Sequence, residues 1–165
     1  MVDACFLINW SRFRQRNDLF TLYSRLVIPS VVFVEVKREP ARSFISQLLA
    51  TKTLLLAPRI ASVDSLALRL FEAINSDPNL PSIDPPEAYA LAFAKVAGLP
   101  FLTDNVAPKA ATLFIRELSG VRVYDSLDVL NMLYSGSRLR EKVGEFMREV
   151  GVRFSRRRLR ELGLA

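Results

Sequence analysis

Short apolar runs alternate with helical stretches along most of this chain, and this alternation limits the folds that it can adopt. Strand character is expected at residues 27–29, 53–57, 100–104 and 121–124, and a first strand or its exit loop is expected from residue 1. Strands separated by helices and short connections favour a parallel sheet covered on both faces. The sequence therefore predicts a three-layer α/β/α fold with a central parallel sheet.

Helices are expected between these strands. Pro29 and Ser30 predict the start of a helix, with Ser30 as the N-cap. The valine-rich run that follows has strand propensity, but its register continues to Glu39 before Pro40 stops it, so we expect a helix there. The expected helices cover residues 18–26, 31–39, 41–50, 63–75, 87–97 and 107–118, and a further helix opens at Asp125-Ser126.

The bulk composition is that of an ordinary globular domain. The chain has 165 residues, of which 50% are hydrophobic and 24% charged, enough for one domain with its own core. The single cysteine, Cys5, cannot form an internal disulfide, and neither a secretory signal nor an unbroken apolar stretch of membrane-spanning length is visible. We therefore expect a cytoplasmic protein that does not insert into membranes.

The charge of the chain is concentrated at its C-terminal end. Residues 136–165 hold nine basic and four acidic groups, whereas residues 1–135 hold fourteen and thirteen. We expect residues 1–135 to form the main domain and residues 136–165 to form a basic helical extension. The arginines of this extension, and Arg12, Arg14 and Arg16, could contact RNA phosphates or simply lie in solvent.

Histidine is absent, although it is the commonest catalytic base and a common metal ligand. Its absence excludes serine and cysteine catalysis of the kinds that need a histidine base. Any chemistry must therefore use carboxylates, hydroxyls, lysine, arginine or the thiol.

Four acids are placed where a parallel sheet would bring them together. Asp3 and Asp104 each follow an expected strand, and the carboxyl ends of parallel strands share one edge of the sheet. Glu35 and Glu87 lie in helices that follow strands, so they can reach the same edge. Four carboxylates repel one another unless a cation lies between them, and oxygen-rich sites suit Mg²⁺ or Mn²⁺. The acids therefore predict a metal site that could activate water against a phosphodiester.

The segments around these acids resemble the four acidic motifs of the PIN-domain ribonucleases, which include the VapC-like toxin nucleases of prokaryotes. Residues 123–130 (VYDSLDVL) are similar to the closing strand and helix of that family, and residues 151–155 (GVRFS) are similar to the tails of some members. The resemblance covers roughly residues 1–135. The four motifs are DACFLIN (3–9), IPSVVFVEV (28–36), EAYALA (87–92) and LTDN (102–105).

The resemblance implies a PIN-like fold and a metal-dependent endoribonuclease that hydrolyses RNA phosphodiester bonds. It implies that Asp3, Glu35, Glu87 and Asp104 coordinate Mg²⁺ or Mn²⁺. It also implies RNA as the substrate, a homodimer, and an antitoxin protein as the partner if the chain is the toxin of a toxin–antitoxin pair.

Several residues keep alternative interpretations at this point. Asp84 could replace or assist Glu87, and Asp3 could cap the segment that follows it. Asn9 could orient Asp3 through a hydrogen bond or serve packing only, and Asn105 is interpreted as a turn residue or a support for the acids. Asp125, Ser126 and Asp128 are interpreted as helix-start residues and are left out of the site.

A non-enzymatic function is the alternative. The first strand has only two residues before Asp3, and Cys5 stands where the family usually has a hydroxyl. Both departures favour a weak or inactive PIN-like module that binds RNA or a protein partner. A phosphatase of the haloacid dehalogenase type is disfavoured, because Asp3-Ala4-Cys5 lacks a second aspartate.

Overall fold

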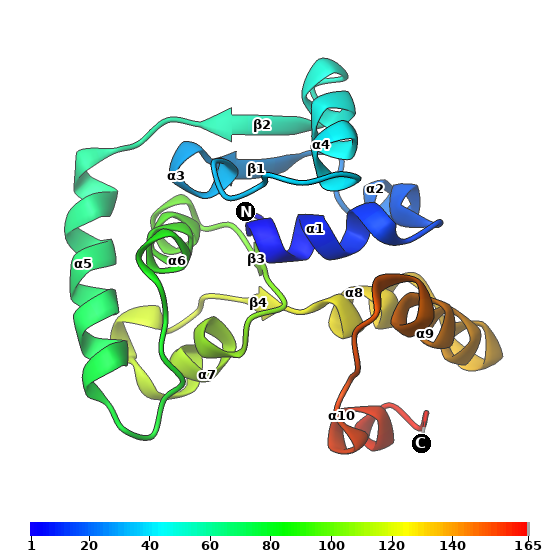
Figure 1. Ribbon diagram of the computed structural model, residues 1–165. Coiled ribbons are helices and arrows are strands. Elements are labelled where there is room, and N and C mark those ends of the chain that lie inside the picture. Colours follow the sequence, from blue (N-terminus) through cyan, green and yellow to red (C-terminus); the bar gives the residue numbers. More distant parts are fainter. Residues whose placement is uncertain (165) are drawn as a thin grey trace.

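The computed structural model describes residues 1–164, which form ten α-helices, two short 3₁₀ helices and four short strands (Figure 1). The helices are α1 (Ala4–Arg12), α2 (Leu19–Leu22), α3 (Ser30–Phe33), α4 (Ala41–Ala50), α5 (Ala61–Ser76), α6 (Pro85–Ala97), α7 (Val106–Phe114), α8 (Ser126–Leu133), α9 (Gly136–Val150) and α10 (Arg156–Glu161), with η1 (Arg16–Asp18) and η2 (Arg116–Leu118). The strands are β1 (Leu26–Pro29), β2 (Leu54–Ala57), β3 (Phe101–Leu102) and β4 (Val123–Tyr124).

The strands form two small parallel sheets. β1 pairs with β2, and β3 pairs with β4. The expected mixture of helices and parallel strands is therefore confirmed. Residues 1–164 are mostly helical, however, and the predicted single central sheet is not clearly formed within them. The reason is strand length, because a pair of two-residue strands can form very few ladder hydrogen bonds.

Residues 1–3 lie between the two sheets (Figure 1). The Val2 amide donates to the carbonyl of Val27 at 2.9 Å, and the Asp3 amide donates to the carbonyl of Leu102 at 2.9 Å. Val2 also forms an isolated parallel bridge with Leu102. The extended segment ends after three residues because Asp3 caps α1, which begins at Ala4. The expectation of a strand or exit loop beyond Asp3 was therefore wrong.

Two expected helices are much shorter than the sequence predicted. α3 ends at Phe33 and not at residue 39, and its N-cap is Pro29, with no side-chain cap from Ser30. The valines of this stretch lose side-chain freedom in a helix, so little local preference extends it. In residues 18–26 only α2 and the end of η1 are helical.

The other helices follow local sequence signals closely. Residues 41–50 form α4 as predicted, and the helices expected at 63–75 and 87–97 each begin two residues earlier, as α5 and α6. α8 starts after Asp125, whose carboxylate accepts from the Asp128 amide while Asp128 accepts in return from the Asp125 amide. This capping box confirms the helix-start interpretation of both acids.

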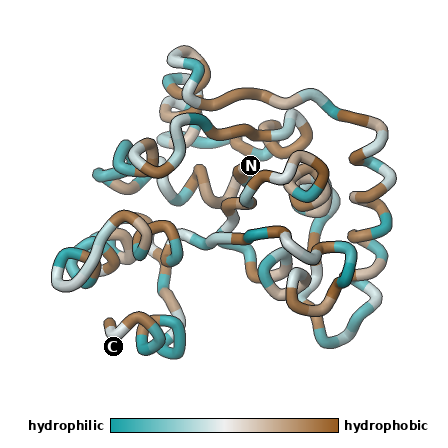
Figure 2. The backbone as a smooth tube through the Cα atoms, turned by 180° about the vertical axis from the view of Figure 1, so that it is seen from behind, coloured by the Kyte–Doolittle hydropathy of each residue, from teal (hydrophilic) through white to brown (hydrophobic). Residues whose placement is uncertain are grey.

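An aromatic cluster joins α9 to α1 in the core. The rings of Trp10 and Phe146 are 5.6 Å apart, and those of Phe13 and Phe146 are 5.1 Å apart. Phe6 stacks on Trp10 at 5.5 Å, and all four side chains are fully buried. Hydrophobic residues also run along the strands, seen as brown stretches of the tube in Figure 2. The helical character expected of residues 136–165 is confirmed by α9 and α10.

Membrane insertion through a helix has no support in residues 1–164, where none of the helices is both long and apolar enough to cross a bilayer.

Replacing Phe146 by alanine should lower the free energy of unfolding by about 3–5 kcal/mol, because it leaves a cavity beside the buried rings of Trp10 and Phe13. Phe114→Ala is the matched control. Its ring is 65% exposed on α7, so a change of no more than about 0.5 kcal/mol is expected. Urea denaturation followed by circular dichroism measures both, and equal losses would contradict the packing described for α9.

Candidate active site

Asp3 lies where the N-terminal segment meets α1, and its side chain is almost completely buried. Oδ1 accepts from the Ala4 amide at 2.8 Å, which caps the helix. Oδ2 accepts from Cys5 Sγ at 2.9 Å and from Thr103 Oγ1 at 3.0 Å. Burial raises the pKa of Asp3, while these donors oppose the rise. The capping interpretation is therefore correct for Oδ1, and Oδ2 faces the end of β3.

Glu87 lies in the first turn of α6 and is only 4% exposed. Its Oε1 is buried and has no hydrogen-bond partner within residues 1–164. Burial raises the pKa of Glu87 to about 7, and the negative charges of Asp3 and Asp84 add to the rise while Asn105 opposes it. A buried carboxylate oxygen without a donor is costly, and it is a position that a bound cation would satisfy.

Asp84 and Glu87 have different tasks in the same turn. Asp84 is exposed and is the N-cap of α6, where its Oδ1 accepts from the Glu87 amide at 2.8 Å. Its charge nevertheless raises the pKa of Asp3 and of Glu87. Glu87 is therefore the buried acid of the cluster, and Asp84 is an exposed neighbour whose charge acts on it.

Glu35 reaches the same cluster from the turn that follows α3. It is exposed, yet burial of its carboxyl group and then the charges of Asp84 and Asp3 raise its pKa. Lys37 opposes the rise. Asp3, Glu35, Asp84 and Glu87 therefore share one negative field, although they come from three distant parts of the chain.

Asp104 is held by hydrogen bonds from α1 and from the start of α8. Its Oδ1 accepts from the Ser126 amide at 2.7 Å, and its Oδ2 accepts from Ser126 Oγ at 2.8 Å and from Asn9 Nδ2 at 2.7 Å. Burial raises the pKa of Asp104, and these donors oppose the rise. The hypothesis that Asn9 orients Asp3 was wrong, because Asn9 binds Asp104 and so connects α1 to the end of β3.

Asn105, three residues after the end of β3, also contacts the acidic cluster. Its Nδ2 donates to Asp3 Oδ2 at 3.2 Å, and its own amide donates to Thr103 Oγ1 at 3.1 Å. The interpretation of Asn105 as a support for the acids is confirmed. Thr103 was missed as a donor to Asp3, and its only sequence signal was a hydroxyl at the end of an apolar strand.

The cluster is not a preformed metal cage. Among residues 1–164 no three Asp, Glu or Cys side chains converge closely enough to hold an ion as they stand. The donor set still fits a hard cation, because it consists of carboxylates that raise one another's pKa and includes the unpaired Oε1 of Glu87. Asp84, Glu87 and Asn105 line an open cavity of about 380 Å³ that gives access to this edge.

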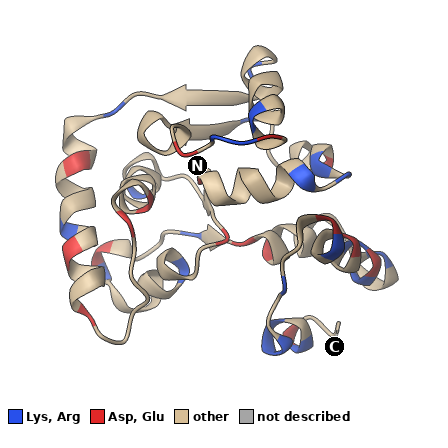
Figure 3. Ribbon diagram, in the orientation of Figure 1, with Lys and Arg blue, Asp and Glu red and all other residues tan. Residues whose placement is uncertain are grey.

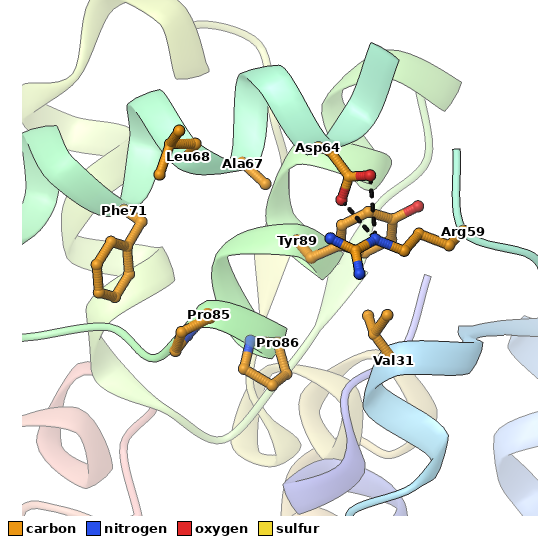
Figure 4. A pocket seen from close by; sticks show the side chains of 9 residues that line it. All are labelled: Val31, Arg59, Asp64, Ala67, Leu68, Phe71, Pro85, Pro86 and Tyr89. Atoms are coloured by element: carbon orange, nitrogen blue, oxygen red, sulfur yellow. Dashed lines mark hydrogen bonds and ion pairs between the residues drawn. The ribbon is translucent and has the colours of Figure 1, made fainter. Parts of the chain in front are cut away.

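A larger apolar cavity of about 460 Å³ adjoins the first turn of α6 (Figure 4). Phe71 and Leu68 line it from α5, and Pro85, Pro86 and Tyr89 line it from α6. At one end Arg59 Nε donates to both oxygens of Asp64, at 2.8 and 3.0 Å. This cavity lacks the carboxylates of the acidic cluster, so it does not extend the candidate active site.

Several arginines that were considered for RNA contact have partners within the protein. Arg158 Nη2 lies 3.3 Å from Asp125 Oδ2 and also pairs with Asp128, and Lys109 pairs with the same two acids. Arg14 pairs with Glu149 at 3.4 Å. Arg16 donates to the Ser11 carbonyl at 2.8 Å and lies over the ring of Phe44. These contacts hold loops and α10 to the body of the domain.

No protein-family model matches this chain, and no curated protein matches it in sequence. The likeness to PIN-domain ribonucleases therefore rests on the sequence motifs alone.

The titration of Glu87 should be visible in the stability of the metal-free protein. Its folded pKa of about 7 exceeds the ordinary value of 4.5, so the folded state holds the proton more tightly. The free energy of unfolding should therefore fall as the pH rises from about 4.5 through 7. Glu87→Gln should remove this loss and be more stable than the wild type at pH 8 by on the order of 1–3 kcal/mol.

Urea denaturation at pH 4 and pH 8 in the presence of EDTA measures this effect. Glu72→Gln serves as the control, because Glu72 is exposed on α5 and should behave like the wild type at both values. A Glu87→Gln variant that is less stable than the wild type at pH 8 would show that the glutamate is not buried as a costly charge.

Proposed function

We propose that this protein is a metal-dependent endoribonuclease with a PIN-like fold. The observation that carries the proposal is the pair of buried acids, Asp3 and Glu87, which lie at one sheet edge without a neutralising lysine or arginine among the described residues. Two further acids, Glu35 and Asp84, share their field. A soluble fold has little reason to bury two adjacent negative charges unless a cation joins them.

The arrangement of the backbone supports the PIN-like part of the proposal. Residues 1–3 hydrogen-bond to β1 on one side and to β3 on the other. The parallel order would thus be β2, β1, residues 1–3, β3 and β4, with its carboxyl ends on one side. Asp3 and Asp104 follow two neighbours in this order, where ligand sites form in open α/β sheets.

Each acid would have a separate task. Glu87 would hold Mg²⁺ or Mn²⁺ with its unpaired Oε1, and Glu35 would approach from the exposed side. Asp3 would join them where the cation displaces one of its four donors. Asp104 would complete the set with about one lone-pair site, because three hydrogen bonds already occupy the others. Asn105 would keep Asp3 in place, in the manner of the outer residues that orient ligands in metal sites.

The chemistry would be hydrolysis of a phosphodiester bond. The cation would lower the pKa of the attacking water and offset charge on the phosphoryl oxygens. The open cavity beside Glu87 would admit the strand, and the exposed carboxylate of Glu35 would be the group best placed to accept a proton from solvent. A homodimer, an antitoxin partner and a role as a toxin remain predictions that rest on the resemblance alone.

Purified wild-type protein should cleave RNA with Mg²⁺ or Mn²⁺ and not with EDTA. Asp3→Asn and Glu35→Gln should each lower the rate by at least about tenfold to a hundredfold, because each removes an oxygen ligand without changing the side-chain shape. Glu35 is exposed, so this variant should fold normally. Glu72→Gln should cleave at the wild-type rate, and equal cleavage by all four proteins would indicate a contaminating nuclease.

Metal binding should also be visible without any substrate. At pH 8, Mn²⁺ at one hundred times its dissociation constant should stabilise the folded wild type by about 2.7 kcal/mol. Its melting temperature should rise accordingly. Glu87→Gln should lose this increase. If Mn²⁺ stabilises neither protein, the alternative of a non-catalytic module that binds RNA or a protein partner becomes the better account.

A further inference from the structure

A second polar cavity adjoins Glu35 and carries the opposite charge. It has a volume of about 200 Å³ and lies between the end of α1, the turn after α3 and the start of α4. Its charged side chains comprise three cations and two acids. The lining residues are Ile8, Ser11, Arg12, Glu35, Lys37, Arg38, Glu39, Pro40 and Ala41.

The three cations are available to an external anion. Among residues 1–164 none of Arg12, Lys37 and Arg38 forms an ion pair with an acid, and all three are exposed. The one side-chain hydrogen bond that they make within that range is a long one, from Arg12 Nη1 to the carbonyl of Val150 at 3.4 Å. The Arg and Lys side chains thus keep most of their donors unused.

The two acids of the cavity form no ion pair with its cations among residues 1–164, although the charge of Lys37 acts on Glu35. Glu39 Oε2 accepts from the Ser43 amide at 3.1 Å, at the start of α4. Glu35 belongs to the acidic cluster, where Asp84 and Asp3 act on it. Glu35 therefore lies at the boundary between the acidic cluster and the basic cavity.

The fold brings these cations together from two separate segments. Arg12 ends α1, and Lys37 and Arg38 belong to the loop between α3 and α4, which runs beside α1 in Figure 3. An acidic cluster by itself repels a polyanionic strand, so a nuclease needs positive charge close to its carboxylates. Arginine binds phosphate oxygens in bidentate fashion, and lysine binds them as a point charge.

We infer that the Arg12–Lys37–Arg38 cavity binds a backbone phosphate of the RNA strand, next to the phosphodiester positioned at the acidic cluster. The inference rests on the proposed function for its choice of RNA. It adds a substrate-binding subsite whose three cations lie outside the four acidic motifs.

Binding of a short fluorescein-labelled single-stranded RNA, measured by fluorescence anisotropy over a series of salt concentrations, tests the subsite. EDTA is present throughout, so no cleavage can occur. The double variant Lys37→Gln/Arg38→Gln should bind roughly tenfold more weakly than the wild type. It should also make the plot of log affinity against log salt less steep by about 0.7, because the cavity holds one phosphate and each lost phosphate contact on a single strand contributes about 0.7.

Arg25→Gln/Arg116→Gln is the matched control, because it removes the same charge from two exposed positions that line none of the cavities described. It should keep the wild-type slope. Melting temperatures of both double variants establish that they are folded. Equal affinities and slopes for the Lys37/Arg38 variant and the control would overturn the subsite.

The outcome for the subsite is separate from that for the nuclease. If Asp3→Asn abolishes cleavage while the Lys37→Gln/Arg38→Gln variant binds RNA like the control, the nuclease stands and the subsite fails. If the wild type cleaves nothing with any metal but that variant alone loses RNA binding, the subsite stands and the nuclease fails.

Discussion

The carboxylate of Asp3 is the interaction on which the rest of the site depends. Oδ1 caps α1, and Oδ2 accepts from Cys5, Thr103 and Asn105. One side chain therefore ends the extended N-terminal segment, starts a helix and fixes that helix against the end of β3. Because the donors to Oδ2 are Cys5, Thr103 and Asn105, Asp3 connects the start of α1 to the segment that follows β3.

Burial of acids at this edge opposes stability. Asp3 and Glu87 are almost fully buried, and burial is the largest cause of the raised pKa of each. Asp3 has four donors, which offset part of the cost, whereas Oε1 of Glu87 has none. A structure that tolerates this cost must be stabilised elsewhere, and the buried aromatic cluster of Trp10, Phe13 and Phe146, at the opposite end of α1, contributes to that stability.

α1 thus connects the acidic cluster, the basic cavity and the aromatic core. Its first residues meet the acidic cluster, its last turn carries Arg12 beside the basic cavity, and its buried face packs on α9. The C-terminal segment returns to the body through Arg158, which pairs with the helix-start acids of α8. These contacts place residues 136–164 in the same packed structure as the strands, and their positive charge is partly used internally.

The sequence alone determined the order of the four strands and of the helices from α2 to α8, but not α1. It also determined the bounds of α4, the capping acids of α8 and the presence of the four acids. Those features depend on residues a few positions apart, so local preference decides them. Tertiary structure decided which side chains meet: Asn9 pairs with Asp104 across 95 positions, and Asn105 with Asp3 across 102. It also decided that residues 1–3 join the two small sheets, because their hydrogen bonds to Val27 and Leu102 depend on segments far apart in the chain.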